Sequence, residues 1–202
     1  MAPSHDAARQ GNLEEVMRLI EEDPEIVDTT DENRYTALYY ASRCGHVEVV
    51  SCLLAQGASI DKKGGGGGMT ALCVSCFMGH LAVVELLFSR GADPTTSNGA
   101  ARWTPLMSAA MRGHVDLVRC LVRIKAVRAT IDAQDFNGQT ALFSASFFGH
   151  TEIMKVLVEA GANPMVTDSY GHTPMDIAMN SGRDECIPIL EVSLKALIRV
   201  IG

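Results

Sequence analysis

The stretch QTALFSASFFGHTEIMKVLVEAGAN, residues 139–163, decides the fold, because the chain repeats its pattern several times. The same arrangement returns as YTALYYASRCGHVEVVSCLLAQGAS at 35–59, MTALCVSCFMGHLAVVELLFSRGAD at 69–93 and WTPLMSAAMRGHVDLVRCLV at 103–122. The threonines that open these copies, with a further one in HTPMDIAMNSGRDE at 172–185, are spaced 34, 34, 36 and 33 residues apart. A period of about 20–50 residues predicts stacked structural repeats.

Each copy predicts two helices. The first begins at the threonine, a favourable N-cap, and ends at a glycine nine residues later, which can adopt the left-handed conformation. The second carries apolar residues at helical spacing, as in Val47, Val50 and Leu53. One helix pair cannot bury its apolar face alone, so the copies are expected to stack.

The T-A/P-L openings, the Gly-His pairs and the closing GAS, GAD and GAN together resemble the ankyrin repeat. The resemblance implies an all-α solenoid of helix-turn-helix repeats with β-turn finger loops, in a single domain spanning 1–202. A partial acidic repeat, 1–34, is followed by full repeats at 35–68, 69–102, 103–138 and 139–171 and by a C-terminal repeat at 172–202.

Three departures from the repeat carry structural expectations. The histidine of the family's T-P-L-H motif is present only as His5, so packing is expected to replace its hydrogen bonds elsewhere. Three extra residues around Lys125–Val127 are expected to lengthen or distort the end of that helix. Pro188 falls in the first turn of the second helix of the C-terminal repeat, where proline is tolerated. The segment ILEVSLKALIRVIG that follows predicts a closing amphipathic helix.

Five consecutive glycines, Gly64–Gly68, stand in DKKGGGGGMTAL at 61–72. A phosphate-binding loop would place its lysine after the last glycine, whereas here both lysines come first. The repeat register instead puts the run in the finger between two repeats. Because ordered glycine costs about 0.5–1 kcal/mol relative to alanine, this surface finger is expected to be the loosest.

Composition and charge exclude several classes. The 202 residues carry a net charge of −7, and residues 1–34 alone hold ten acidic groups and three basic ones, which argues against sequence-blind nucleic-acid binding. We expect no membrane span and no secretory signal. Six irregularly spaced cysteines without such a signal predict reduced thiols in the cytoplasm or nucleus, and a monomer is expected.

Candidate metal and catalytic residues are explained by the repeat. The four Gly-His histidines are separated by whole repeats, and Cys73 and Cys76 fall at buried helix positions with no second pair at zinc spacing. Cys44 lies at a face position where it can be exposed. Motifs of hydrolases and metalloproteases are lacking. We therefore expect no metal, no cofactor and no enzymatic activity.

The residues at positions that, by the resemblance, project onto a concave partner-binding face are mostly large and apolar. Those before the inter-helix glycines are Arg43, Cys44, Phe77, Met78, Met111, Arg112, Phe147 and Phe148. Those of the fingers are Tyr35, Met69, Trp103, Phe136 and Tyr170. We expect them to form a groove for a protein partner, although some of them could instead pack between neighbouring repeats.

The expected function is therefore non-catalytic protein–protein binding, as scaffold, adaptor or inhibitor. The alternative is a regulatory or targeting domain of a larger enzyme, such as a kinase or ubiquitin ligase. A basic group, partly offset by Asp116, is either a solvated helix face or a site for a phosphate, a lipid headgroup or an acidic peptide. Its members are Arg112, Arg119, Arg123, Lys125 and Arg128.

Overall fold

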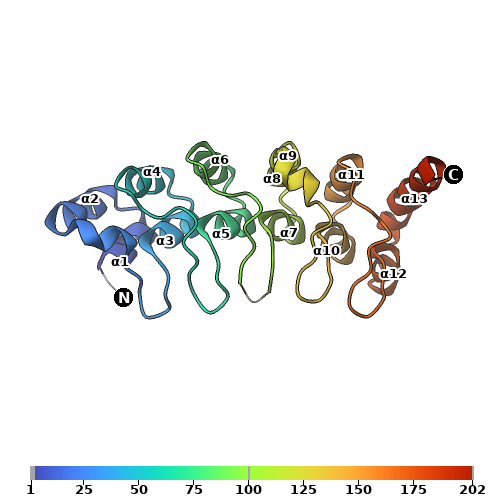
Figure 1. The fold of residues 1–202 in the computed structure, drawn as a ribbon, viewed down its shortest axis with the longest axis horizontal. Helices are drawn as coiled ribbons and strands as arrows, with labels where there is room; N and C mark the ends of the chain where they lie inside the picture. The colour runs from blue at the N-terminus through green and yellow to red at the C-terminus, as the bar shows by residue number, and fades with distance from the viewer. Residues whose placement is uncertain (1–2, 100, 202) are drawn as a thin grey trace. The chain divides into compact units, whose positions relative to one another are not determined.

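The computed structural model describes residues 3–99 and 101–201, with side chains up to Leu197. These residues form α-helices and two short 3-10 helices joined by hairpin loops (Figure 1). They include no helix that is both long and apolar enough to cross a membrane. The chain divides into two compact units, unit 1 (Met1–Ala101) and unit 2 (Arg102–Gly202).

Unit 1 consists of helix pairs packed side by side. Its elements are α1 (Pro3–Gln10), α2 (Leu13–Glu22), η1 (Pro24–Asp28), α3 (Ala37–Cys44), α4 (Val47–Ala55), α5 (Ala71–Met78) and α6 (Leu81–Ser89). The first helices pack in the order α1–α3–α5 and the second helices in the order α2–α4–α6 (Figure 1). Fully buried leucines such as Leu38, Leu53 and Leu72 fill the space between the rows.

Unit 2 has the same two-row arrangement. Its elements are α7 (Pro105–Met111), α8 (Val115–Val122), α9 (Lys125–Ala129), α10 (Ala141–Phe148), α11 (Thr151–Glu159), α12 (Pro174–Asn180), η2 (Asp184–Cys186) and α13 (Ile187–Ile201). Helices α7, α10 and α12 form one row, and α8, α11 and α13 form the other. The all-α repeat fold is confirmed.

The predicted helix caps are confirmed. Thr36, Thr70 and Thr140 each accept a hydrogen bond from the backbone N–H three residues later, which satisfies a donor left over at the helix start. The same bond is present at Thr104 and Thr173. The glycines at the ends of these helices all have positive φ, between 65° and 89°.

The Gly-His histidines tie neighbouring repeats together. Nε2–H of His46 donates to the carbonyl of Arg9 at 3.0 Å, and that of His80 to the carbonyl of Arg43 at 3.0 Å. In unit 2, His150 donates to Met111 in the same way at 3.3 Å. These rings act as structural donors, and no cluster of metal-binding residues is present in the part of the chain that the structure describes.

The T-P-L-H position is filled in a different way in each repeat. His5 is fully buried and its Nε2–H donates to the Thr29 carbonyl at 3.2 Å. Cys73 substitutes a thiol, which donates to the Thr96 carbonyl at 3.4 Å. Cys73 and Cys76 are both buried, as expected, and Cys44 is exposed. A hydrogen bond is therefore retained at Cys73, where the sequence predicted packing alone.

The glycine finger makes specific contacts with its neighbours, which the sequence did not predict. Gly64 and Met69 exchange two backbone hydrogen bonds of 2.9 Å, and Gly99 N–H donates to the Gly67 carbonyl at 2.9 Å. A Cβ on Gly65, whose φ is +68°, would lie 2.3 Å from the hydroxyl oxygen of Tyr35. A Cβ added at Gly64 or Gly68 would likewise lie 2.7 Å from a backbone atom of a neighbouring finger, which is too close for any side chain. Close approach therefore requires glycine at 64, 65 and 68, whereas a Cβ added at Gly66 or Gly67 would lie in open space.

Of the two outcomes expected for the extra residues of repeat 103–138, lengthening or distortion of the helix end, the structure shows distortion of the end of α8. That helix ends at Val122, and the insertion forms the separate short helix α9, Lys125–Ala129. Ile124 has an extended backbone (φ −78°, ψ 120°), which breaks the helix between them. The proline prediction is confirmed, because Pro188 is the second residue of α13, and α13 is the closing helix that the tail predicted.

Candidate functional site

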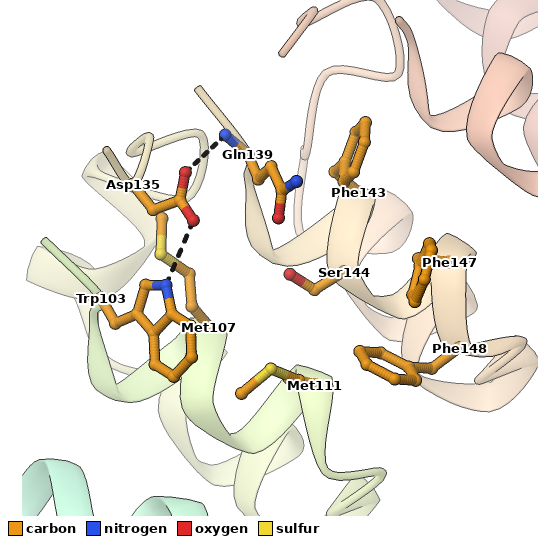
Figure 2. Close-up of a pocket in the computed structure, with 9 residues that line it drawn as sticks. All are labelled: Trp103, Met107, Met111, Asp135, Gln139, Phe143, Ser144, Phe147 and Phe148. Carbon is orange, nitrogen blue, oxygen red and sulfur yellow. Dashed lines mark hydrogen bonds between the residues drawn. The ribbon is translucent and has the colours of Figure 1, made fainter. Parts of the chain in front are cut away.

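A buried carboxylate at the turn of one finger organises the candidate site. Asp135 Oδ1 accepts the backbone N–H groups of Asn137 and Gln139, both at 2.8 Å, and so fixes the finger turn. Its other oxygen, Oδ2, accepts the indole N–H of Trp103 at 3.1 Å (Figure 2). The ring of Trp103 is therefore held by a carboxylate of the neighbouring finger, which lies 32 positions away in the sequence.

The same carboxylate turn occurs in two other fingers with different partners. Asp31 Oδ1 accepts the N–H groups of Asn33 and Tyr35, and its Oδ2 accepts the hydroxyl of Tyr40 at 2.7 Å. Burial acts to raise the pKa of Asp31, but these hydrogen bonds outweigh it and hold the pKa below its ordinary value. Asp168 repeats the turn beside His172. Among the three, Asp135 is the carboxylate that holds a tryptophan.

Trp103 forms one wall of a cavity in unit 2, which we call the aromatic pocket (Figure 2). The cavity has a volume of about 180 Å³ and lies between α7, α10 and the finger that contains Asp135. Its lining residues are Trp103, Met107, Met111, Asp135, Gln139, Phe143, Ser144, Phe147 and Phe148. Six of these nine residues are aromatic rings or methionines, so the walls suit an apolar side chain.

The outer rim of the aromatic pocket consists of two exposed phenylalanines. Phe147 and Phe148 leave 42% and 41% of their surface exposed, and their rings meet edge to face at 4.9 Å. Phe148 also stacks on the ring of His150 at 6.0 Å. The two rings are thus held by contacts with other rings, while about two-fifths of the surface of each residue remains accessible to solvent.

Two polar side chains face into the aromatic pocket. Figure 2 shows the amide of Gln139 and the hydroxyl of Ser144 pointing toward the space between the walls. Both residues are half-buried, and neither side chain forms a hydrogen bond with another residue that the structure describes. The amide can donate and accept at once, as a peptide main chain does. The arrangement therefore suits binding, and it contains no nucleophile paired with a base.

The structure brings together four of the residues expected on the partner face: Trp103, Met111, Phe147 and Phe148. Phe136 and Tyr170 are exposed at finger tips by 72% and 81% but do not line the pocket. Arg112 is exposed at the end of α7, outside the lining.

The remaining candidates lie in unit 1. Tyr35 is stacked on Tyr39 at 3.9 Å, with its ring over the backbone of the glycine finger. Met69, Phe77 and Met78 are half-buried, whereas Arg43 and Cys44 are exposed. Tyr35 therefore packs within its own unit, which is the alternative that the sequence left open for part of this set.

Five lining residues were not on the predicted face. Met107 and Phe143 stand at the T-P-L-H position, where the sequence predicted packing alone. Gln139 precedes its capping threonine just as Tyr35 and Trp103 do, but it is polar, whereas the finger residues predicted to line the face are large and apolar. Ser144 and Asp135 carry no sequence signal for a pocket, because their roles arise from contacts across the finger and helix.

Comparison with known proteins gives a family and a fold. Residues 4–98, 96–168 and 123–194 match the family model described as ankyrin repeats (3 copies). A solved structure of the predatory endopeptidase Bd0816 from Bdellovibrio bacteriovorus in complex with the immunity protein Bd3460 contains a similar chain, with a TM-score of 0.84 and 24% identity. The match covers 95% of this chain and 97% of that chain, which supports the fold.

The curated relatives are similar over a shorter stretch. The liver isoform of mitochondrial glutaminase from Mus musculus is 33% identical over 75 residues, which are 37% of this chain and 12% of that protein. The E3 ubiquitin-protein ligase KEG from Arabidopsis thaliana is 33% identical over 66 residues, 32% of this chain and 4% of that protein. The chain thus spans only a small part of these relatives.

Proposed function

Because the chain belongs to the ankyrin repeat family, whose repeats mediate protein–protein interaction, we propose that it binds a partner protein through the aromatic pocket of unit 2. It acts there as a scaffold, adaptor or inhibitor, without catalysis. The observation that carries the proposal is the pair Phe147 and Phe148, both about two-fifths exposed on the rim of a cavity with apolar walls.

The energetics favour a contact at this place. Full burial of a phenylalanine side chain is worth roughly 1.5–3 kcal/mol, and binding energy in interfaces concentrates in central aromatic residues. Trp103 is fixed by Asp135 and the two phenylalanines by each other, so little side-chain freedom is lost when a partner binds.

Replacement of Phe147 by glutamine tests the proposal. The partner is first captured on immobilised protein and identified by mass spectrometry, and its affinity for F147Q is then measured. We expect a loss of about tenfold or more, with little change in the melting temperature because the ring is already 42% exposed. The matched control is Y170Q, which removes an aromatic ring that is 81% exposed and outside the pocket.

A different result would favour internal packing. If F147Q lowers the melting temperature by several degrees while affinity per folded molecule is unchanged, Phe147 contributes to the fold and not to a contact. Equal losses for F147Q and Y170Q would argue against the aromatic pocket as the binding site.

A second candidate is a regulatory or targeting domain of a larger enzyme. Its support is that the matched stretch is a minor part of a glutaminase and of a ubiquitin ligase. Coding sequence that continues in frame on either side, and encodes a catalytic domain, would favour this role. An open reading frame bounded at these residues would favour the separate binding protein.

The proposed binding protein is a monomer of the cytoplasm or nucleus with no nucleic-acid partner. The net charge of −7 opposes attraction to nucleic acid, and the cysteines suit a reducing compartment. Sedimentation and microscopy of the tagged protein check the first two statements, and gel shift with DNA and RNA checks the third.

A further inference from the structure

A basic cleft lies in unit 2, apart from the aromatic pocket, on the row of second helices. It has a volume of about 290 Å³ and lies between α8, α9 and α11, which appear close together in Figure 1. Arg119, Arg123 and Arg128 line it together with a single acidic residue, Glu159. Val122 and Val156 contribute an apolar floor. We call this the basic cleft.

The basic cleft is built by the departures of this repeat from the others. The three extra residues end α8 early and form α9, and Arg128 stands where other repeats close with glycine. Arg128 Nε–H donates to the Val122 carbonyl at 3.2 Å, which fixes its guanidinium over the cleft. Arg112, expected in the same basic group, does not line the cleft.

The three arginines of the basic cleft differ in their pairing with neighbouring carboxylates. Arg119 lies 3.5 Å from Asp116 and 3.9 Å from Glu152, and the latter also pairs with Lys155 at 2.6 Å. Arg123, by contrast, forms no ion pair with any residue in the described part of the chain. Arg123 and Arg128 therefore contribute two guanidinium groups to the cleft, and the acidic residue of its lining is Glu159.

We propose that the basic cleft binds an acidic peptide segment of a partner protein. One carboxylate of the segment pairs with Arg123 and Arg128, because the planar guanidinium matches a carboxylate in fork geometry. An adjacent apolar side chain of the segment packs on Val122 and Val156. Glu159 accepts N–H groups of its main chain. This site is independent of the aromatic pocket and its binding.

The shape and charge of the cleft favour a peptide over a compact anion. The basic cleft, of about 290 Å³, is lined by arginines and also by Val122, Val156 and Ala160, so it offers apolar contacts that an inorganic anion cannot use. Glu159 also repels a doubly charged phosphate more than a single carboxylate. The valine floor gives an apolar side chain a place that a free anion lacks.

The test uses a fluorescein-labelled peptide of alternating glutamate and leucine. The full chain is added to it, and the fluorescence anisotropy of the peptide is measured at about 0.05 and 0.15 M salt. We expect R123E to weaken binding about tenfold or more. E159Q is expected to strengthen binding a few-fold, because it removes the one opposing charge. The matched control K63E reverses an exposed lysine in unit 1 and should leave the affinity unchanged, and so should F147Q.

Several results would overturn the proposal. These are equal affinity of R123E and wild type, equal binding of a lysine–leucine peptide, and displacement of the peptide by millimolar inorganic phosphate. Binding to vesicles that contain a phosphoinositide, in place of the peptide, would assign the cleft to a membrane surface and reject the peptide. Loss of peptide binding in F147Q would place the peptide in the aromatic pocket instead.

Discussion

Tyr35 in unit 1 and Trp103 in unit 2 stand at the same position of the repeat, immediately before a capping threonine, yet they lie differently. The ring of Tyr35 stacks on Tyr39 and lies on the backbone of the next finger, where it meets Gly65. Trp103 instead donates its indole N–H to Asp135 of its next finger and forms the wall of a cavity.

The residue across from the ring decides between these arrangements. Gly65 and Asp135 occupy the same place in their fingers, five residues before a capping threonine. Because Gly65 has no side chain, the ring of Tyr35 packs directly on the main chain of this finger and fills the space beside it. Aspartate holds the tryptophan by its N–H and fixes its own finger with two backbone bonds, so a hollow remains. The same register thus supports a packed surface in one unit and an open pocket in the other.

The largest expected effect on stability comes from Gly65→Val. A side chain at φ +68° adopts the left-handed region, at a cost of about 1–2 kcal/mol. Its Cβ would also lie 2.3 Å from the Tyr35 hydroxyl oxygen, so the stacked ring must move. We expect the free energy of unfolding to fall by about 3 kcal/mol in urea denaturation.

The control for this change is Gly66→Val, which is exposed and has nothing within 4 Å of an added Cβ. It should change stability by no more than about 0.5 kcal/mol. Two variants of equal stability would show that Tyr35 does not depend on the glycine. Shortening Gly64–Gly68 to a tight turn should likewise destabilise unit 1, contrary to the expectation of a loose finger.

Asp135→Ala should have the next largest effect. It leaves the N–H groups of Asn137, Gln139 and the Trp103 indole without their acceptor, at an expected cost of about 1–2 kcal/mol. Asp168→Ala is the matched control, since it loses the same pair of backbone bonds but holds no tryptophan. Trp103 fluorescence should change in the first variant alone, and an identical spectrum in both would break the comparison.

Ser144→Tyr should fill the hollow. In unit 1 the corresponding position, four residues after the capping threonine, is Tyr40, which packs against its neighbours. Ser144 is half-buried beside an open cavity, so we expect stability to change by less than about 1 kcal/mol. Partner affinity should fall about tenfold or more. Unchanged affinity in a folded variant would show that the partner does not enter the cavity.

The smallest effect is expected where the two units are alike, in the aspartates at the bases of their fingers. Asp61 and Asp132 each accept a backbone N–H from the next finger, and burial raises both pKa values above the ordinary 3.8. Because each carboxyl binds its proton more tightly in the folded state, its ionisation destabilises the fold. The contribution of each aspartate to stability is therefore full below its unfolded pKa and is lost as the pH rises through its folded pKa.

Asp132→Asn keeps an acceptor for Asn163 and removes the buried charge. We expect it to stabilise the protein at pH 7 by a few tenths of a kcal/mol, reduced by solvent screening, and to have no such effect at pH 3. Melting at the two pH values measures this. Asp61→Asn should behave in the same way, and a gain at pH 3 in either variant would contradict the sign.

Most of the helical framework could be predicted because its signals are local. The threonine caps bind N–H groups three residues away, and the helix-ending glycines need only their own backbone angles. The end of α8 was harder, since three extra residues could lengthen the helix or distort its end. The extended backbone at Ile124 shows the second outcome, with α9 carrying Arg128 to the basic cleft.

The sequence by itself determined the repeat, the helix pairs and the rule that large residues precede the threonines and glycines, because these depend on spacing along the chain. Only the tertiary structure decided which of those residues are packed and which line a pocket. Trp103 with Asp135 and Tyr35 with Gly65 are contacts between residues about 30 positions apart. Whether such a pair closes or opens a surface depends on side-chain size and hydrogen bonding between neighbouring fingers, which periodicity does not encode.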